Sequence, residues 1–358
     1  MRVAFDETGF ELDATGSARA ARCLRDALTA RPDVELVSIA QPPNRGGRIL
    51  RGLVRELAWY PLELPRRARA ARVDALHCPM PLAPSRRLTL PVLVTVNDAI
   101  PWDHPEWLSR AHALHARLVL APAMRHAAQV LVPSQHTRER LLARVRGLSP
   151  DRVAVTPYGI DLRFSPGPGP PGATPYLLAV GTLQPRKNLE AALRAFERLA
   201  VDGYEHRLVV VGARGWRDAE LLATVRRSAV ANRIDLKGRV EEPELLMLYR
   251  GADCLMYPSR AEGFGFPPLE AMACGTPVVC SAAGSLPEVT GAAALVVEPG
   301  DAAGLAAAVE RAVRDPAPLR AAGLAQAQRF SWARCAELTV AAYSVARERS
   351  PRTSRSAS

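Results

Sequence analysis

Three features are missing from this sequence of 358 residues, and each absence narrows the class of protein. It has no run of 18 apolar residues, because arginine or proline interrupts every candidate, so no membrane-spanning helix is expected. Its first ten residues place Asp6 and Glu7 where a signal peptide needs its apolar stretch, which argues against export. Its six cysteines form no Cys-x-x-Cys pair and several lie in apolar runs, which indicates reduced core thiols. We therefore expect a cytoplasmic protein.

Charge is plentiful but uneven. Residues 1–165 carry 24 arginines, no lysine and 16 acidic residues, a net charge of +8, whereas residues 166–358 carry only +3 of the total +11. Such a basic half can face nucleic acid, anionic lipid or a phosphorylated acceptor, or can be the solvated surface of an arginine-rich protein. A nucleic-acid partner is not expected, because the basic half lacks the interleaved aromatic side chains on which bases stack.

Short apolar segments alternate with helical patterns along the whole chain, which predicts an α/β fold with parallel sheets. The predicted strands are RVAFD (2–6), VELVSI (34–39), DALHC (74–78), PVLVTV (91–96), QVLVP (129–133), RVAVTP (152–157), YLLAVG (176–181), RLVVVG (207–212), IDLKG (234–238), DCLMYP (253–258), TPVVCSA (276–282) and ALVVE (294–298). The length suits two domains, each a doubly wound, Rossmann-like sheet.

The pattern breaks between Gly159 and Pro175, where FSPGPGPPGATP holds five prolines and three glycines. Such a stretch cannot form a helix or a central strand, so it is interpreted as a linker between domains. The predicted domains are 1–165 and 166–331, followed by a helix at 332–348 that crosses back to the first domain and a disordered tail at 349–358. A central cleft between the carboxyl ends of two such sheets is where ligands of this fold class bind.

Arg186 and Lys187 follow the strand at 176–181 and precede a helix that begins near Asn188. Two cations beside a helix N-terminus favour a diphosphate, because the free N–H groups and the helix dipole already attract an anion. A lysine at position 187 supports this interpretation, because the chain has 45 arginines and only one other lysine, Lys237. The alternative is an exposed basic pair on a turn.

The segment SRAEGFGFPPLEAMACGTPVV follows the strand at 253–258 and holds two acids, Glu262 in the loop and Glu270 in the next helix. Gly263 and Gly265 allow a ligand to approach the backbone closely, so N–H groups can meet phosphates while the carboxylates accept from sugar hydroxyls. The alternatives are a surface acid at Glu262 and, at Glu270, an acid that balances the helix dipole.

With VGTLQPRKN upstream, Glu262-x7-Glu270 in EGFGFPPLEAMACGTPVV resembles the retaining glycosyltransferases of family 4, whose fold is called GT-B. The resemblance covers nearly all of residues 150–345 and continues through VTPYGID, GARGW, GRVEEPELLMLYRGAD, SLPEV and RFSWARCAE. It is thinner in the first half, at TGSARAARCLRDAL and VTVNDAIPWDHPE. Within the family the chain looks similar to the bacterial mannosyltransferases that build cell-surface polysaccharides.

This resemblance implies an acceptor-binding first domain, a second domain that binds a nucleotide-diphosphate sugar, and transfer of a hexose with retention. Arg186 and Lys187 would hold the diphosphate, Glu262 the transferred sugar and Glu270 the ribose. The other implied donor contacts are Gly16, Arg239, Val240, Gly263, Phe264 and Gly265. GDP-mannose is the first expectation for the donor, and the acceptor is a glycan, a lipid-linked molecule or a small molecule.

One departure qualifies the resemblance, and one absence bears on the chemistry. Asn97 and Asp98 stand where the family usually has His-Asp, whose histidine touches the donor sugar from the first domain. The resemblance therefore implies a sugar contact for Asn97, which can hydrogen-bond but cannot carry a proton. No Asp-x-Asp occurs in the chain, so we expect no metal and no cofactor, with Arg186 and Lys187 supplying the positive charge. The rival functions are a nucleotide-sugar epimerase on the same fold and a non-catalytic GT-B partner subunit.

Residues 45–72 form a basic, partly apolar segment with eight arginines against Glu56 and Glu63. Such a segment suits docking at an anionic membrane, where it would bring a soluble enzyme to a lipid-linked acceptor at the inner face. The alternative is a pair of solvated helices that pack their apolar side on the core.

Overall fold

The computed structural model describes residues 1–11, 16–42, 52, 54–172, 174–215 and 218–349. The chain forms two compact units, which are Met1–Gly159 with Trp332–Ser358 and Ile160–Ser331. Residues 160–165, which were predicted to lie in the first domain, belong to the second unit because they pack there. The ring of Phe164 meets Tyr249 at 6.0 Å between centroids, and Arg163 forms an ion pair with Glu242.

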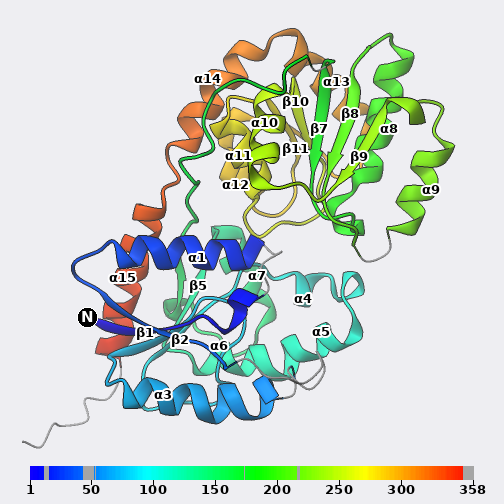
Figure 1. Cartoon of the computed structure of the whole chain (residues 1–358). Helices are drawn as coiled ribbons and strands as arrows, with labels where there is room; N and C mark the ends of the chain where they lie inside the picture. Colours follow the sequence, from blue (N-terminus) through cyan, green and yellow to red (C-terminus); the bar gives the residue numbers. More distant parts are fainter. Residues whose placement is uncertain (12–15, 43–51, 53, 173, 216–217, 350–358) are drawn as a thin grey trace, which may run out of the picture. The chain divides into compact units, whose positions relative to one another are not determined.

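The first unit is built on a parallel six-stranded sheet of order β2-β1-β3-β4-β5-β6 (Figure 1). Its strands are β1 (Arg2–Asp6), β2 (Glu35–Ile39), β3 (Ala75–Cys78), β4 (Val92–Thr95), β5 (Gln129–Val132) and β6 (Val153–Val155). Its helices are α1 (Gly16–Thr29), α3 (Leu64–Ala70), α4 (Ile100–Asp103), α5 (Arg110–His115), α6 (Ala121–His126), α7 (Gln135–Arg144) and α15 (Trp332–Glu348). The central strands β3, β4 and β5 are fully buried, as parallel strands covered on both faces must be.

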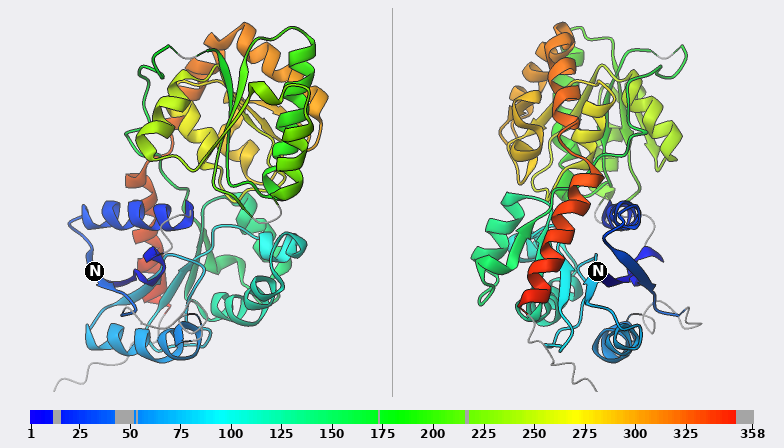
Figure 2. Two further views of the ribbon diagram at one scale, coloured as in Figure 1. Left: turned by 45° about the vertical axis from the view of Figure 1, so that its right-hand side comes forward. Right: turned by 90° about the vertical axis from the view of Figure 1, so that its left-hand side faces the viewer.

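The second unit repeats this plan of a sheet flanked by helices (Figures 1 and 2), and its strands are parallel in the order β12-β11-β10-β7-β8-β9. Its strands are β7 (Tyr176–Val180), β8 (Arg207–Val211), β9 (Ile234–Gly238), β10 (Cys254–Tyr257), β11 (Val278–Ser281) and β12 (Leu295–Val297). Its helices are α8 (Leu189–Val201), α9 (Ala219–Arg227), α10 (Glu242–Gly251), α11 (Phe266–Ala273), α12 (Leu286–Thr290), α13 (Ala302–Arg314) and α14 (Pro316–Ala327). The predicted fold class is confirmed, and every predicted strand segment contains one of the twelve strands.

The proline- and glycine-rich segment lies in the second unit, where it packs against the end of α10. Arg250 donates from Nε to the carbonyl of Ser165 at 2.8 Å. A Cβ on Gly169 would lie 2.5 Å from the Cα of Gly251, so only glycine allows this close approach. The segment is therefore not a free connector, although it contains neither helix nor strand among its described residues.

The helix α15 returns to the first unit and is fixed there by a buried polar contact. The His77 ring, on β3, lies 2.7 Å from the Tyr343 hydroxyl through Nδ1 and 2.9 Å from the Thr95 hydroxyl through Nε2. Burial lowers the pKa of His77 to about 3, so the imidazole is neutral. One ring nitrogen then donates and the other accepts, and the two hydroxyls complete both bonds.

The cysteines are reduced, as predicted, and all except Cys23 are buried. Among the described residues, no helix is both long enough and apolar enough to cross a membrane.

A carboxyl group is buried at the end of β1. Asp6 is 4% exposed and accepts from the Thr8 backbone N–H at 3.1 Å and from the Tyr60 hydroxyl at 3.1 Å. Burial raises the pKa of Asp6 to about 6, because these donors only partly offset the lost hydration. The folded chain therefore holds this proton more tightly than the unfolded chain does.

We expect Asp6 to make stability depend on pH. Its contribution to the free energy of unfolding is fully present below pH 3.8. This contribution, about 3 kcal/mol, is lost as the pH rises through about 6. Asp6→Asn removes this titration, so the variant should gain stability relative to the wild type between pH 4.5 and pH 7.5. Urea midpoints of both proteins at the two pH values measure the difference. If the urea midpoints of the two proteins differed by the same amount at pH 4.5 and at pH 7.5, Asp6 would not titrate between these pH values.

Candidate functional site

The order of the second sheet places the candidate site. From β7 the chain moves outward to β8 and β9, then crosses back so that β10 pairs with β7 on its other side. The loops after β7 and β10 therefore leave neighbouring strands in opposite directions, and ligands of open parallel sheets bind at such a point. These two loops carry Arg186, Lys187 and Glu262.

Hydrogen bonds between the two loops hold them together. Asn188 adopts the left-handed conformation, with φ of 51°, just before α8, and its Nδ2 donates to the carbonyl of Pro258 at 3.1 Å. The backbone N–H of Arg260 donates to the carbonyl of Arg186 at 2.7 Å. Asparagine tolerates positive φ better than most residues, which explains its use at this helix start. The backbone that carries the two cations is thus fixed against the backbone that carries Glu262.

Glu262 is the centre of a buried polar cluster. Its Oε1 accepts from Lys187 Nζ at 2.6 Å, from the Tyr257 hydroxyl at 2.9 Å and from the Ser259 hydroxyl at 2.5 Å. Its Oε2 accepts from Arg186 Nη1 at 3.1 Å. Lys187 Nζ also donates to the Tyr257 hydroxyl at 2.6 Å. The predicted trio of Arg186, Lys187 and Glu262 is therefore brought together.

The cations decide the charge of Glu262. Burial alone would raise the pKa of Glu262, but the nearby charges of Lys187 and Arg186, with the hydrogen bonds of Lys187 and Ser259, lower it to about 2. Burial and the Glu262 charge raise the pKa of Tyr257 well above its usual range, so its phenol stays a neutral donor. Glu262 is thus ionised at physiological pH and can accept hydrogen bonds but cannot donate a proton.

The cluster carries one excess positive charge, from two cations and one carboxylate. Lys187 has a side chain 10% exposed, while that of Arg186 is 27% exposed. An anion that met these cations would be favoured by a low local dielectric and by the fixed position of both groups. Within the described part of the chain, no group of three or more His, Cys, Asp or Glu side chains could hold a metal ion.

The glycine-rich turn after Glu262 leads into α11. Gly265 has a φ of 101° and precedes the first helical residue, so a side chain there would strain the backbone. Phe264 is 4% exposed, with its ring against Phe266 and Phe330, which makes it a packing residue in this structure. Glu270, on α11, is 2% exposed and accepts from the Tyr249 hydroxyl at 2.8 Å.

The neutral groups that fix Glu262 were not predicted from the sequence. Tyr257 and Ser259 donate to its carboxylate, and Ser285 donates from both N and Oγ to its backbone carbonyl. A Cβ on Gly284 would lie 2.4 Å from that same carbonyl oxygen. Tyr257 and Ser259 are polar residues at the carboxyl end of β10, a strand at the switch point of the sheet. That position is the sequence signal by which they could have been predicted.

The other predicted donor contacts lie elsewhere. Arg239, which is exposed, and Val240, which is half-buried, follow β9 at the edge of the second sheet. The remaining predicted residues belong to the first unit: Gly16, Asn97 and Asp98.

Asn97 follows β4 and contacts the start of α1. Its Nδ2 donates to the Ser17 hydroxyl at 2.7 Å, and its Oδ1 accepts from the hydroxyl of Tyr158. The structure thus brings Asn97 beside Gly16, the first residue of α1. Asp98 closes the following turn, because its Oδ1 accepts a hydrogen bond from the backbone N–H of Ile100 at 3.0 Å.

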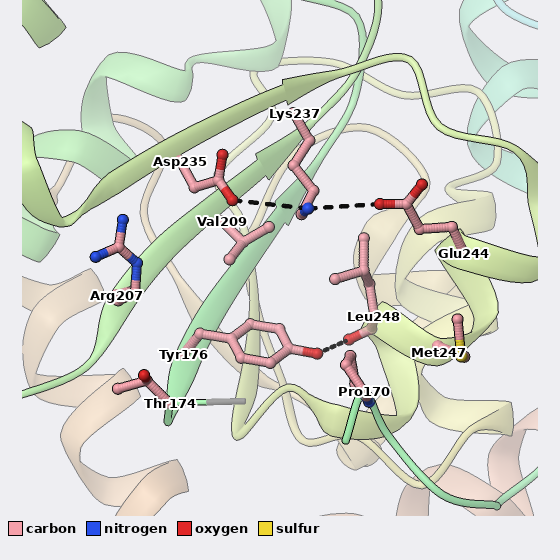
Figure 3. Close-up of a pocket in the computed structure, with 10 residues that line it drawn as sticks. All are labelled: Pro170, Thr174, Tyr176, Arg207, Val209, Asp235, Lys237, Glu244, Met247 and Leu248. Atoms are coloured by element: carbon pink, nitrogen blue, oxygen red, sulfur yellow. Dashed lines mark hydrogen bonds and ion pairs between the residues drawn. The ribbon is translucent and has the colours of Figure 1, made fainter. Parts of the chain in front are cut away.

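A separate cavity of about 450 Å³ lies on the second unit (Figure 3). Its lining includes Tyr176 and Arg207, the first residues of β7 and β8, so it reaches the opposite end of these strands from Lys187. Lys237 projects into it between Asp235 and Glu244. Its Nζ lies 3.7 Å from Asp235 Oδ2 and 3.4 Å from Glu244 Oε1. None of the predicted site residues lines this cavity.

Two family profiles match successive parts of the chain. The profile described as Glycosyltransferase Family 4 matches residues 14–164, and the one described as Glycosyl transferases group 1 matches residues 163–329. An O-antigen chain mannosyltransferase B from Escherichia coli is 33% identical over 334 residues, which are 87% of this chain and 86% of that protein. A D-inositol 3-phosphate glycosyltransferase from Geodermatophilus obscurus is 34% identical over 69% of this chain and 57% of its own.

Solved structures share the fold at lower identity. A sucrose-phosphate synthase from Thermosynechococcus elongatus has a TM-score of 0.77 at 22% identity, covering 96% of this chain and 98% of its own. Anabaena HepE, solved in complex with UDP and glucose, has a TM-score of 0.73 at 18% identity, covering 96% of this chain and 99% of its own.

Proposed function

The chain belongs to glycosyltransferase family 4, with the GT-B fold, and from this premise we propose that it is a retaining mannosyltransferase that uses GDP-mannose. The Escherichia coli relative, which is named for mannosyl transfer in the O-antigen chain, supports mannose as the sugar. The proposed acceptor is a glycan, a lipid-linked molecule or a small molecule. The observation that carries the proposal is the pair of cations that meets an ionised Glu262 at the switch point of the second sheet.

In this proposal Arg186 and Lys187 bind the donor diphosphate. The bond between the anomeric carbon and the phosphate oxygen breaks, so negative charge grows on the departing phosphate. Fixed cations lower the energy of that charge more in the transition state than in the bound donor, which is the condition for catalysis.

Glu262 then positions the sugar without exchanging a proton, because its low pKa keeps it ionised. Four donors already occupy its carboxylate, which makes it a poor nucleophile. Both features favour direct attack by the acceptor oxygen on the face that the phosphate leaves. The new carbon–oxygen bond forms there, and the acceptor's proton passes to the departing phosphate oxygen.

Slow hydrolysis of the donor tests both the sugar and the stereochemistry without a known acceptor. We expect GDP to be released from GDP-mannose at least about tenfold faster than UDP from UDP-glucose. Proton NMR during the first minutes should show α-mannose, the anomer of the donor, before the anomers equilibrate. Faster use of UDP-glucose would overturn the choice of donor, and β-mannose as the first product would overturn retention.

The same assay tests metal independence. We expect GDP release to continue unchanged in an excess of EDTA, because Arg186 and Lys187 supply the charge that a metal ion supplies in other transferases. If EDTA stopped the reaction and magnesium or manganese restored it, the account of leaving-group stabilisation would be wrong.

A further inference from the structure

Four large leucines stand in solvent on the first unit. Leu57 is 71% exposed, Leu62 57%, Leu114 56% and Leu118 64%. They lie on two helical segments, a π-helical stretch at Arg55–Glu63 that continues into α3, and α5 with the π-helical turn Ala116–Leu120 that continues into α6. Exposed leucines that occur singly need no explanation, but four on adjoining segments do.

The helical geometry puts each pair on one face. In the first segment hydrogen bonds span five residues, as from the N–H of Leu64 to the carbonyl of Trp59, so Leu57 and Leu62 stack on the same side. In the second segment Leu114 and Leu118 are four residues apart and also share a side.

The two segments touch each other beside these leucines. His115 Nε2 lies 3.3 Å from Glu56 Oε2, and these two residues directly neighbour Leu114 and Leu57 in the chain. The inner sides of both segments pack into one core, which holds Trp59, Tyr60, Leu64 and Ala68 from the first and Leu120, Ala121, Ala123 and Met124 from the second. Both pairs of leucines are therefore exposed on segments that touch each other and share one core, and these four residues are called the leucine face.

The leucine face lies among basic side chains. Arg66, four residues after Leu62, has a side chain 80% exposed, and Arg110, four residues before Leu114, is also exposed. Residues 55–70 and 110–126 together contain seven arginines against two glutamates and no aspartate or lysine. Amphipathic helices with leucine on one face and arginine on the polar face bind in the interface of anionic membranes.

We propose that the leucine face docks on the surface of an anionic lipid bilayer. The leucines enter the boundary between headgroups and acyl chains, and the arginines meet lipid phosphates. The proposal enlarges the basic segment 45–72 of the sequence analysis, because Leu114, Leu118, Arg110 and Arg117 come from a second part of the chain. Residues 43–51 and 53 lie outside the described residues and carry no part of it. Docking does not depend on which donor the enzyme uses.

Co-sedimentation with vesicles tests the proposal on the full chain. We expect binding to vesicles of phosphatidylcholine and phosphatidylglycerol at low salt, none to phosphatidylcholine alone, and a decline as salt rises. Each cation at the surface contributes about fivefold to the partition coefficient. The double variant Leu57→Ser, Leu118→Ser should bind at least about tenfold more weakly. Leu162→Ser, which alters a leucine 91% exposed on the second unit, is the matched control and should bind as the wild type does.

Two measurements separate docking from other causes. Donor hydrolysis without vesicles should be equal in the double variant and the wild type, so a loss of binding with full hydrolysis locates the defect at the leucine face. Absence of wild-type binding at low salt, or equal binding by the double variant, would overturn the proposal. So would a wild-type dimer in light scattering that the double variant loses, because a second copy would then cover the leucines.

Discussion

Lys187→Ala is expected to remove nearly all transfer activity while the protein stays folded. A charge-assisted bond to a phosphate is worth about 1.5–3 kcal/mol in binding, and more in the transition state, where the leaving group gains charge. We therefore expect kcat/KM to fall by a factor on the order of 100 to 1,000. Glu262 keeps Arg186, Tyr257 and Ser259 as donors in this variant, so its carboxylate is not left unpaired.

Lys237 offers the matched control, because it is the only other lysine in the sequence. It pairs with Asp235 and Glu244 beside the cavity of Figure 3, which none of the predicted site residues lines. Lys237→Ala should therefore keep wild-type turnover. Thermal unfolding of both variants reports how much protein is folded. Near wild-type turnover in folded Lys187→Ala would rule out the diphosphate role.

Asn97→Ala is expected to reduce turnover per folded molecule by a factor on the order of 10 to 100, with little change in the affinity for free GDP. The reason is that Asn97 is proposed to bind the donor sugar, whereas the proposed diphosphate ligands, Arg186 and Lys187, belong to the second unit. Asn97→His restores the usual family residue and should keep substantial activity. Calorimetry with GDP and the donor hydrolysis assay measure the two quantities on one preparation.

The neighbours of Asn97 provide its control. The alanine variant also leaves the buried Tyr158 hydroxyl and the Ser17 hydroxyl without this partner, so some loss of stability is expected. Tyr158→Phe removes one of these contacts but keeps the Asn97 side chain. If Tyr158→Phe lowered turnover as much as Asn97→Ala, Asn97 would act by holding the local structure. Unchanged turnover in folded Asn97→Ala would remove it from the site.

The sequence predicted the sheets and part of the site for a physical reason. Parallel strands are continuous apolar runs, and each run was visible between helical patterns. Parallel strands also bring their carboxyl ends to one edge, so residues that follow β7 and β10 could be expected to meet if those strands were neighbours. Arg186, Lys187 and Glu262 do meet, 70 or more residues apart in the chain.

The contacts inside the cluster could not be predicted in the same way. The register of two loops decides that Tyr257 and Ser259 donate to Glu262, and no periodicity in the sequence records that register. The domain boundary was placed at residue 165 because the prolines and glycines begin there, whereas the packing of Phe164 on Tyr249 assigns residues 160–165 to the second unit. Local composition marks a break in regular structure but not the unit to which the segment adheres.

The return of α15 has a consequence for the order of events during synthesis. The second unit is one continuous stretch inserted into the first, and the first unit includes the helix that begins at Trp332. Tyr343 supplies the buried partner of His77, at the centre of the first sheet. Nascent domains fold as units while the ribosome elongates the chain. The inserted unit can therefore fold first, whereas the unit made earlier cannot complete its core until residues 332–348 have left the ribosome.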